Sequence, residues 1–166
     1  LFADQTILVT GGGTGIGRAI SHELASLGAN VIIASRKLEK LQATAKEIEG
    51  SGGNCSTYTL NIRNEESINA TFDEILKDHK TIDALVNNAG GQFPSPAENI
   101  NQKGWHAVTE TNLTGTFLMS KTAYNRALRK NSGCIVNIVA EMWNGFPGMV
   151  HTGARSEEHT SELQSR

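Results

Sequence analysis

The sequence predicts an α/β protein with a doubly wound parallel sheet. Short β-branched or apolar runs alternate with helical patterns from the first residues to about residue 139. Such alternation is typical of βαβ units, in which a helix crosses over the sheet between two parallel strands. A glycine-rich turn also separates the first strand pattern from the first helical pattern. Because the alternation stops after a fifth strand, we expect half of a doubly wound fold, truncated at that point.

The first strand and the first helix have the clearest patterns. Residues 6–10 read Thr-Ile-Leu-Val-Thr, a β-branched run that ends in glycines and predicts a buried strand. The helix is expected from about Gly15 to Leu27, and Gly28 is a typical C-terminal stop. Its apolar residues recur at three- and four-residue spacing, at Ile16, Ile20, Leu24 and Leu27.

The remaining elements repeat this unit. Strands are expected at residues 31–34, 56–62, 84–86 and 134–139. Helices are expected at about residues 38–50, around residues 68–76 and over about residues 104–129. A loop with prolines, Gly91 to Asn101, precedes the last and longest of these helices. The inward stripe of that helix is expected to run through Trp105, Val108, Phe117 and Met119.

Composition excludes several classes of partner. The 166 residues are enough for one domain, and 38% hydrophobic with 19% charged residues is ordinary for a globular protein. The net charge is −2 without a basic run, so neither nucleic acid nor an anionic membrane is expected as a partner. No apolar stretch is long enough to cross a bilayer. The two cysteines, Cys55 and Cys134, lack a metal-ligand spacing, so no metal site is expected.

Residues 10–17, Thr-Gly-Gly-Gly-Thr-Gly-Ile-Gly, carry the strongest functional signal. Glycines alone would indicate only a turn, but these lie between a strand and a helix. There, glycine lets the backbone approach a pyrophosphate, and the helix N-terminus supplies free N–H groups and a positive dipole end. The turn therefore predicts a dinucleotide site formed by Gly11, Gly13, Thr14, Gly15, Ile16 and Gly17.

The end of the second strand indicates which dinucleotide binds. An acidic residue there would favour NAD, whereas an arginine accommodates the 2′-phosphate of NADP. This chain has Ser35, Arg36 and Lys37, and no acid before Glu39. Arginine can form a forked pair with phosphate, and lysine adds a point charge. The pattern favours NADP(H), although Arg36 and Lys37 could also simply begin an exposed helix.

Four motifs in order resemble the short-chain dehydrogenase/reductase family. They are the Thr-Gly-x-x-x-Gly-x-Gly spacing, Asn-Asn-Ala-Gly at residues 87–90, Asn112 in the long helix and Ile-Val-Asn-Ile at residues 135–138. The resemblance covers about residues 5–154 and implies a Rossmann fold.

The resemblance also assigns roles to polar residues outside the glycine turn. It implies that Asn61 and Ile62 lie beside the adenine, and that Asn88, Ala89 and Gly90 lie beside the adenosine ribose. Asn88 could alternatively be a simple turn residue at a strand end. The asparagine that matches Asn112 holds a water of a proton relay behind a catalytic tyrosine and lysine. The alternative is that Asn112 bonds a neighbouring backbone carbonyl.

The chain departs from the family pattern after the fifth strand. Ala140 occupies the place of the usual catalytic serine, no tyrosine follows Tyr124, and no lysine follows Lys130. Residues 155–165 resemble the translation of a sequencing-library adapter. We therefore expect an incomplete domain over residues 1–154 and a non-native tail over 155–166, with a genuine polar tail as the alternative. The tyrosine and lysine are expected in the natural continuation, and the fragment itself is expected to be inactive.

Within the family, the chain most resembles peroxisomal trans-2-enoyl-CoA reductases and their bacterial relatives. The matching segments are residues 61–66, 91–93, 95–98, 103–108, 110–117, 145–147 and 151–154. That subgroup also lacks the usual serine, in agreement with Ala140 here. The resemblance implies NADPH-dependent reduction of a trans-2-enoyl-CoA thioester in fatty acid metabolism, by a homo-oligomer in the peroxisome or cytoplasm. A 3-oxoacyl (ketone) reductase and a cofactor-binding pseudoenzyme are the alternatives.

Overall fold

The computed structural model describes residues 1–140 and 148–153. The predicted tail at residues 155–166 and the family-like segment 145–147 lie outside the described residues. Within the described part of the chain, no helix is both long and apolar enough to cross a membrane.

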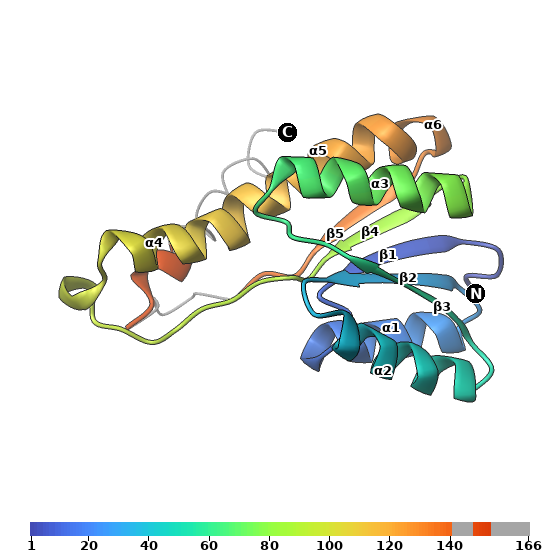
Figure 1. Ribbon diagram of the computed structural model, residues 1–166, viewed down its shortest axis with the longest axis horizontal. Helices are drawn as coiled ribbons and strands as arrows, with labels where there is room; N and C mark the ends of the chain where they lie inside the picture. Colours follow the sequence, from blue (N-terminus) through green and yellow to red (C-terminus); the bar gives the residue numbers. More distant parts are fainter. Residues whose placement is uncertain (141–147, 154–166) are drawn as a thin grey trace.

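Five strands form one parallel sheet in the order β3-β2-β1-β4-β5. The strands are β1 (Thr6–Thr10), β2 (Asn30–Ser35), β3 (Asn54–Thr59), β4 (Ala84–Asn87) and β5 (Cys134–Asn137). The chain builds outward from β1 to β3, then returns to place β4 on the other side of β1 (Figure 1). This order confirms the predicted doubly wound fold, and its switch point lies between β1 and β4, where such sheets bind ligands.

Helices cover both faces of the sheet. The helices α1 (Gly15–Ser26) and α2 (Leu38–Gly50) lie on one face, and α3 (Glu65–His79) lies on the other with α5 (Gly115–Ala123) (Figure 1). Successive strand residues point to opposite faces. Thus Val9 belongs to the apolar cluster beneath α1 and α2, whereas its neighbour Leu8 belongs to the cluster with Phe72 of α3 and Met119 of α5.

The predicted long helix is continuous but contains two wider turns. It comprises α4 (Gln102–Thr109), the π turn η2 (Glu110–Thr114), α5, the π turn η3 (Tyr124–Leu128) and α6 (Arg129–Asn131). A short 3₁₀ turn, η1 (Ala97–Asn99), precedes it.

The predicted inward stripe of this helix is wrong at two of its four positions. Val108 and Met119 are buried, but Trp105 is 38% and Phe117 is 63% exposed. Residues two apart on a helix do not face the same side, so Phe117 points away from the core when Met119 points into it. The buried stripe instead follows steps of three and four residues, through Val108, Asn112, Thr116, Met119 and Ala123.

Two predicted strands have wrong ends. The third was expected at residues 56–62, but β3 pairs with β2 from Asn30↔Asn54 to Ser35↔Thr59. β2 ends at Ser35, whose carbonyl still accepts from the N–H of Leu60, and the next N–H, of Asn61, donates to Ser67 of α3 instead. The fifth strand was expected to reach residue 139, but β5 ends opposite Asn87, the last residue of β4. In both cases the neighbouring strand decides the length.

Candidate functional site

A pocket of about 330 Å³ lies at the carboxyl ends of the parallel strands. Most of the predicted cofactor residues line it, namely Gly11, Thr14, Ile16, Ser35, Arg36, Asn61, Ile62, Asn88, Ala89 and Gly90. Four further lining residues were not predicted: Ala34, Leu60, Arg63 and Thr111. Gly13, Gly15, Gly17 and Lys37 were predicted as cofactor residues but do not line the pocket. The structure thus brings together residues of β2 and η2 with the segments that follow β1, β2, β3 and β4.

Two glycines of the turn, Gly11 and Gly17, lie in close contact with neighbouring atoms. Gly11 has φ +72°, and a Cβ there would lie 2.9 Å from Asn88 Nδ2. A Cβ on Gly17 would lie 2.3 Å from the same nitrogen and 2.5 Å from the carbonyl oxygen of Gly11. Gly17 therefore lets α1 approach the turn and the end of β4, whereas Gly11 supplies a backbone conformation that glycine adopts readily.

Thr10 joins the glycine turn to the Asn-Asn-Ala-Gly segment. Its hydroxyl donates to the carbonyl of Val86 at 3.3 Å and accepts from the backbone N–H groups of Asn88 and Ala89, both at 3.0 Å. In return, the side-chain amide of Asn88 donates to the carbonyl of Thr10 at 2.9 Å. Thr10 is only 1% exposed, so water does not compete for these bonds. Sequence reasoning did not assign Thr10 to the site, although it directly precedes the glycine run.

Two arginines, Arg36 and Arg63, line the pocket, and they differ in whether they form an ion pair. Arg63 is paired with Glu110 of η2, and its Nε lies 3.2 Å from Glu110 Oε2. Arg36 is exposed at the end of β2 and forms no salt bridge within the described residues. Arg36 is therefore free to meet an anion, while the charge of Arg63 is already balanced. Among residues 1–140 and 148–153, no cluster of acidic, histidine and cysteine side chains is suited to hold a metal ion.

These features fit a dinucleotide. The side chain of the N-cap residue Thr14 does not cap the first turn of α1, so the helix N-terminus remains available to a phosphate. The glycine turn allows close backbone approach, and Arg36 supplies a free positive charge at the strand end expected to meet the ribose. The backbone geometry and the charge of the pocket are thus compatible with a pyrophosphate and a 2′-phosphate.

Asn112 holds the loop that follows Gly90. It is 3% exposed and lies within the π turn η2. Its Nδ2 donates to the carbonyl of Gly91 at 2.9 Å, and its Oδ1 accepts from the N–H of Gly91 at 2.9 Å. This is the backbone bonding considered as the alternative role, but the partner is distant in sequence. π turns are frequent at functional sites, and the role of Asn112 in a proton relay stays a prediction.

Ala140 lies just beyond β5, where a catalytic serine was expected from the family pattern. It is half-buried, and its methyl group offers no hydrogen bond to a substrate oxygen. The tyrosine and lysine expected in the natural continuation are not among the 166 residues, and they stay a prediction.

Comparison with known proteins agrees with this architecture. A family model described as short chain dehydrogenase matches residues 5–155. A peroxisomal 2,4-dienoyl-CoA reductase of Danio rerio is 38% identical over 156 residues, which are 93% of this chain and 52% of that protein. A citronellol catabolism dehydrogenase (AtuB) of Pseudomonas aeruginosa PAO1 is 49% identical with a TM-score of 0.92, covering 97% of this chain and 66% of that structure. The F189W actinorhodin polyketide ketoreductase with NADPH is 29% identical with a TM-score of 0.89, covering 95% and 61% respectively. This chain thus spans about half the length of the Danio rerio relative.

Proposed function

Because this chain belongs to the short-chain dehydrogenase family, we propose that the full-length protein is an NADPH-dependent reductase of unsaturated acyl-CoA thioesters. The chain would be its N-terminal part, with native sequence to about Ala154 and a non-native tail after it. The 52% coverage of the Danio rerio relative supports a full-length protein longer than this chain.

The guanidinium of Arg36, which has no ion-pair partner among the described residues, carries the choice of cofactor. It lines the pocket at the end of β2, where an acidic residue would be needed to accept from the ribose of NAD. Arg36 would bind the 2′-phosphate by a forked pair, with Lys37 as a second charge. The related ketoreductase solved with NADPH supports the same choice. Asn61 and Ile62 would meet the adenine, and Asn88, Ala89 and Gly90 the adenosine ribose.

The proposed reaction saturates a carbon–carbon double bond conjugated to a thioester carbonyl. When bound, NADPH would supply a hydride for the β-carbon of a 2-enoyl thioester, or for the δ-carbon of a 2,4-dienoyl thioester, whose product in the Danio rerio relative is named a (3E)-enoyl-CoA. In both cases a proton would be added at the α-carbon. Negative charge then develops on the thioester oxygen, where hydrogen-bond donors stabilise it. Asn112 would contribute by fixing the loop at Gly91 and by holding a water of the proton relay. Tyrosine and lysine of the natural continuation would complete that relay.

The substrate class is supported by Ala140 and by the relatives. The Danio rerio relative is named a 2,4-dienoyl-CoA reductase, and trans-2-enoyl and 2,4-dienoyl thioesters share the conjugated double bond. The related ketoreductase favours a 3-oxoacyl substrate as the second candidate. Ala140 counts against it, because the ketone oxygen would lose its usual serine donor. We further propose a homo-oligomer in the peroxisome, the compartment in the name of the Danio rerio relative, or in the cytoplasm.

The test is the loss of NADPH absorbance in the full-length protein with three substrates. We expect turnover of trans-2-enoyl-CoA or 2,4-dienoyl-CoA and little with 3-oxoacyl-CoA. Turnover of 3-oxoacyl-CoA alone would establish the ketone reductase. NADPH binding without turnover of any of the three would favour a pseudoenzyme, as would a natural continuation without tyrosine and lysine.

A variant tests the cofactor assignment. Arg36→Ala should raise the Kd of NADPH about ten- to hundredfold and change that of NADH little, because a charged hydrogen-bond partner of the 2′-phosphate is lost. Arg129→Ala is the matched control, since Arg129 is exposed on α6 and lies outside the pocket lining.

A further inference from the structure

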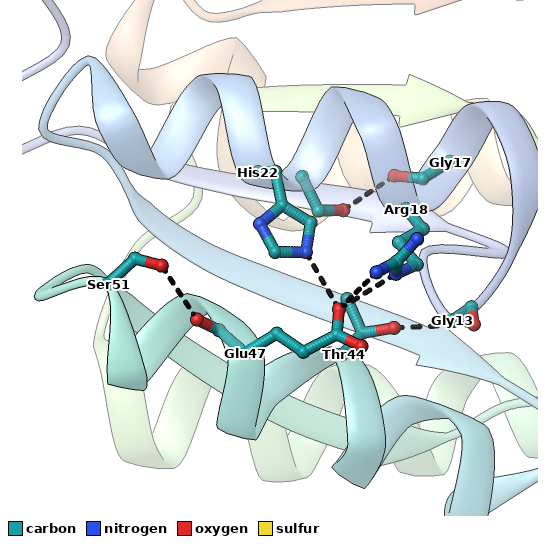
Figure 2. A network of polar contacts seen from close by, with 8 residues as sticks. Gly13, Gly17, Arg18, His22, Thr44, Glu47 and Ser51 are labelled. Atoms are coloured by element: carbon teal, nitrogen blue, oxygen red, sulfur yellow. Dashed lines mark hydrogen bonds and ion pairs between the residues drawn. The ribbon is translucent and has the colours of Figure 1, made fainter.

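The helix α2 touches the glycine turn through a partly buried contact. A Cβ on Gly13 would lie 3.1 Å from the backbone nitrogen of Leu41 and 3.1 Å from the carbonyl carbon of Lys40. The hydroxyl of Thr44 donates to the carbonyl of Gly13 at 3.3 Å, and Figure 2 shows it reaching from α2 to the turn. Thr44 is 1% exposed. Gly13 therefore packs against α2, which explains why it does not line the pocket.

A second contact between α1 and α2 lies nearby at the surface. The carboxylate of Glu47 accepts from Arg18 Nε at 2.8 Å and lies 3.0 Å from His22 Nε2 (Figure 2). The side chain of Arg18 is 50% exposed and that of Glu47 is 43% exposed. Exposed ion pairs contribute little because water and salt screen them. Of the two contacts, the hydrogen bond from the buried Thr44 is less exposed to water, and it is the one expected to fix the turn against α2.

The same helix begins at the predicted 2′-phosphate site. Lys37 is the N-cap of α2, and the N–H of Leu41 donates to the carbonyl of Lys37 at 3.4 Å. The first turn of α2 therefore contacts Gly13 and also continues into Lys37 and Arg36. A helix is a stiff element with a fixed rise per residue. Movement of α2 against Gly13 would change the separation between the glycine turn and Arg36.

We propose that Thr44 is a positioning residue that sets this separation for NADP(H). The pyrophosphate and the 2′-phosphate belong to one ligand, so the two protein segments that meet them have to be held at a matching distance. Thr44 does this through Gly13 and α2 without touching the cofactor. The inference rests on the proposed function, because it requires the 2′-phosphate to bind at Arg36.

The test compares three variants of the full-length protein by fluorescence titration with NADPH and with NADH. Thr44→Val keeps the shape but leaves the carbonyl of Gly13 without its partner. Thr44→Ser keeps the hydroxyl. Thr71→Val is the matched control, since Thr71 is 4% exposed and its hydroxyl lies 3.0 Å from the carbonyl of Thr59 on the opposite face of the sheet.

We expect Thr44→Val to raise the Kd of NADPH about three- to tenfold, the range for one lost hydrogen bond, and that of NADH less than about twofold. Thr44→Ser should bind NADPH like the wild type. Thr71→Val should lose thermal stability without a change in either Kd. If Thr44→Val does not fold, Thr44→Ala replaces it. The same rise in the Kd of NADPH is expected, because this variant also lacks the hydroxyl.

Three results would overturn the inference. They are an unchanged Kd for NADPH in Thr44→Val, an equal rise for both nucleotides, and an equal effect of Thr71→Val. Each presupposes a wild type that prefers NADPH. A wild type that binds NADH as tightly as NADPH, or binds neither, would instead overturn the proposed cofactor and the inference with it.

Discussion

Replacement of Gly17 by alanine tests the close approach of α1 to the end of β4. The new Cβ would lie 2.3 Å from Asn88 Nδ2 and 2.5 Å from the carbonyl oxygen of Gly11. Carbon atoms make favourable contacts at about 3.5–4.0 Å, so the neighbours have to retreat by about 1 Å. The amide of Asn88 cannot turn away without losing its 2.9 Å bond to the carbonyl of Thr10.

Overpacking of this kind costs about 1–3 kcal/mol, and the lost hydrogen bond costs about 1 kcal/mol. Alanine returns about 1 kcal/mol through its higher helix propensity. The expected net loss is about 2 kcal/mol, or about 4–8 °C in the thermal midpoint of a domain of this size.

Thermal unfolding of the full-length protein, followed by circular dichroism, measures this loss. Gly50→Ala is the matched control, because Gly50 ends α2 and a Cβ added there would meet nothing within 4 Å. That variant should unfold at or slightly above the wild-type midpoint. A midpoint for Gly17→Ala equal to that of Gly50→Ala would refute the packing argument.

Three further predictions concern side chains with defined surroundings. Hydrogen bonds from Arg18 and His22 lower the pKa of Glu47, so the stability they give is present above the ordinary carboxyl range and is lost as the pH falls through the lowered pKa. The difference in thermal midpoint between wild type and Glu47→Gln should accordingly shrink between about pH 7 and about pH 3, and a constant difference would contradict this. Burial raises the pKa of the Cys55 thiol to about 12, so iodoacetamide should label Cys55 only after unfolding. Peptide mapping separates Cys55 from the exposed Cys134, and rapid labelling of Cys55 itself in the folded protein would be inconsistent with this. Asn112→Ala removes two partly buried hydrogen bonds and should lower turnover more than NADPH affinity, and an unchanged kcat would exclude a role in the reaction.

Local patterns predicted the fold well where a residue's surroundings follow from its neighbours in sequence. Residues 6–10 are buried at every position, as expected of a β-branched run in a parallel sheet. The ends of β3 and β5 could not be predicted in the same way, because each strand ends where its partner strand ends. The prediction that Phe117 points into the core was wrong because it ignored helical periodicity. Phe117 and Met119 are two residues apart, so their side chains lie on different sides of the helix.

In the candidate site, too, residues in local motifs could be predicted, whereas contacts between distant segments could not. Arg36, Asn88 and the glycine turn could be found because short motifs with a known mechanism contain them. The pairing of Arg63 with Glu110 joins residues 47 positions apart and depends on how η2 meets the turn after β3. Thr10 could have been found, since a threonine at the buried end of a strand needs partners for its hydroxyl.

The order of pocket residues along the chain has a consequence for synthesis on the ribosome. Within residues 1–140 and 148–153, every lining residue lies between Gly11 and Thr111. The hydroxyl of Thr10 gains the N–H of Asn88 as a partner only after 78 further residues have been added. A nascent chain that has emerged through Thr111 already carries the pocket side chains that the structure describes. A ligand that binds only the folded state stabilises it by mass action, so the proposed dinucleotide would stabilise these folded segments while translation continues.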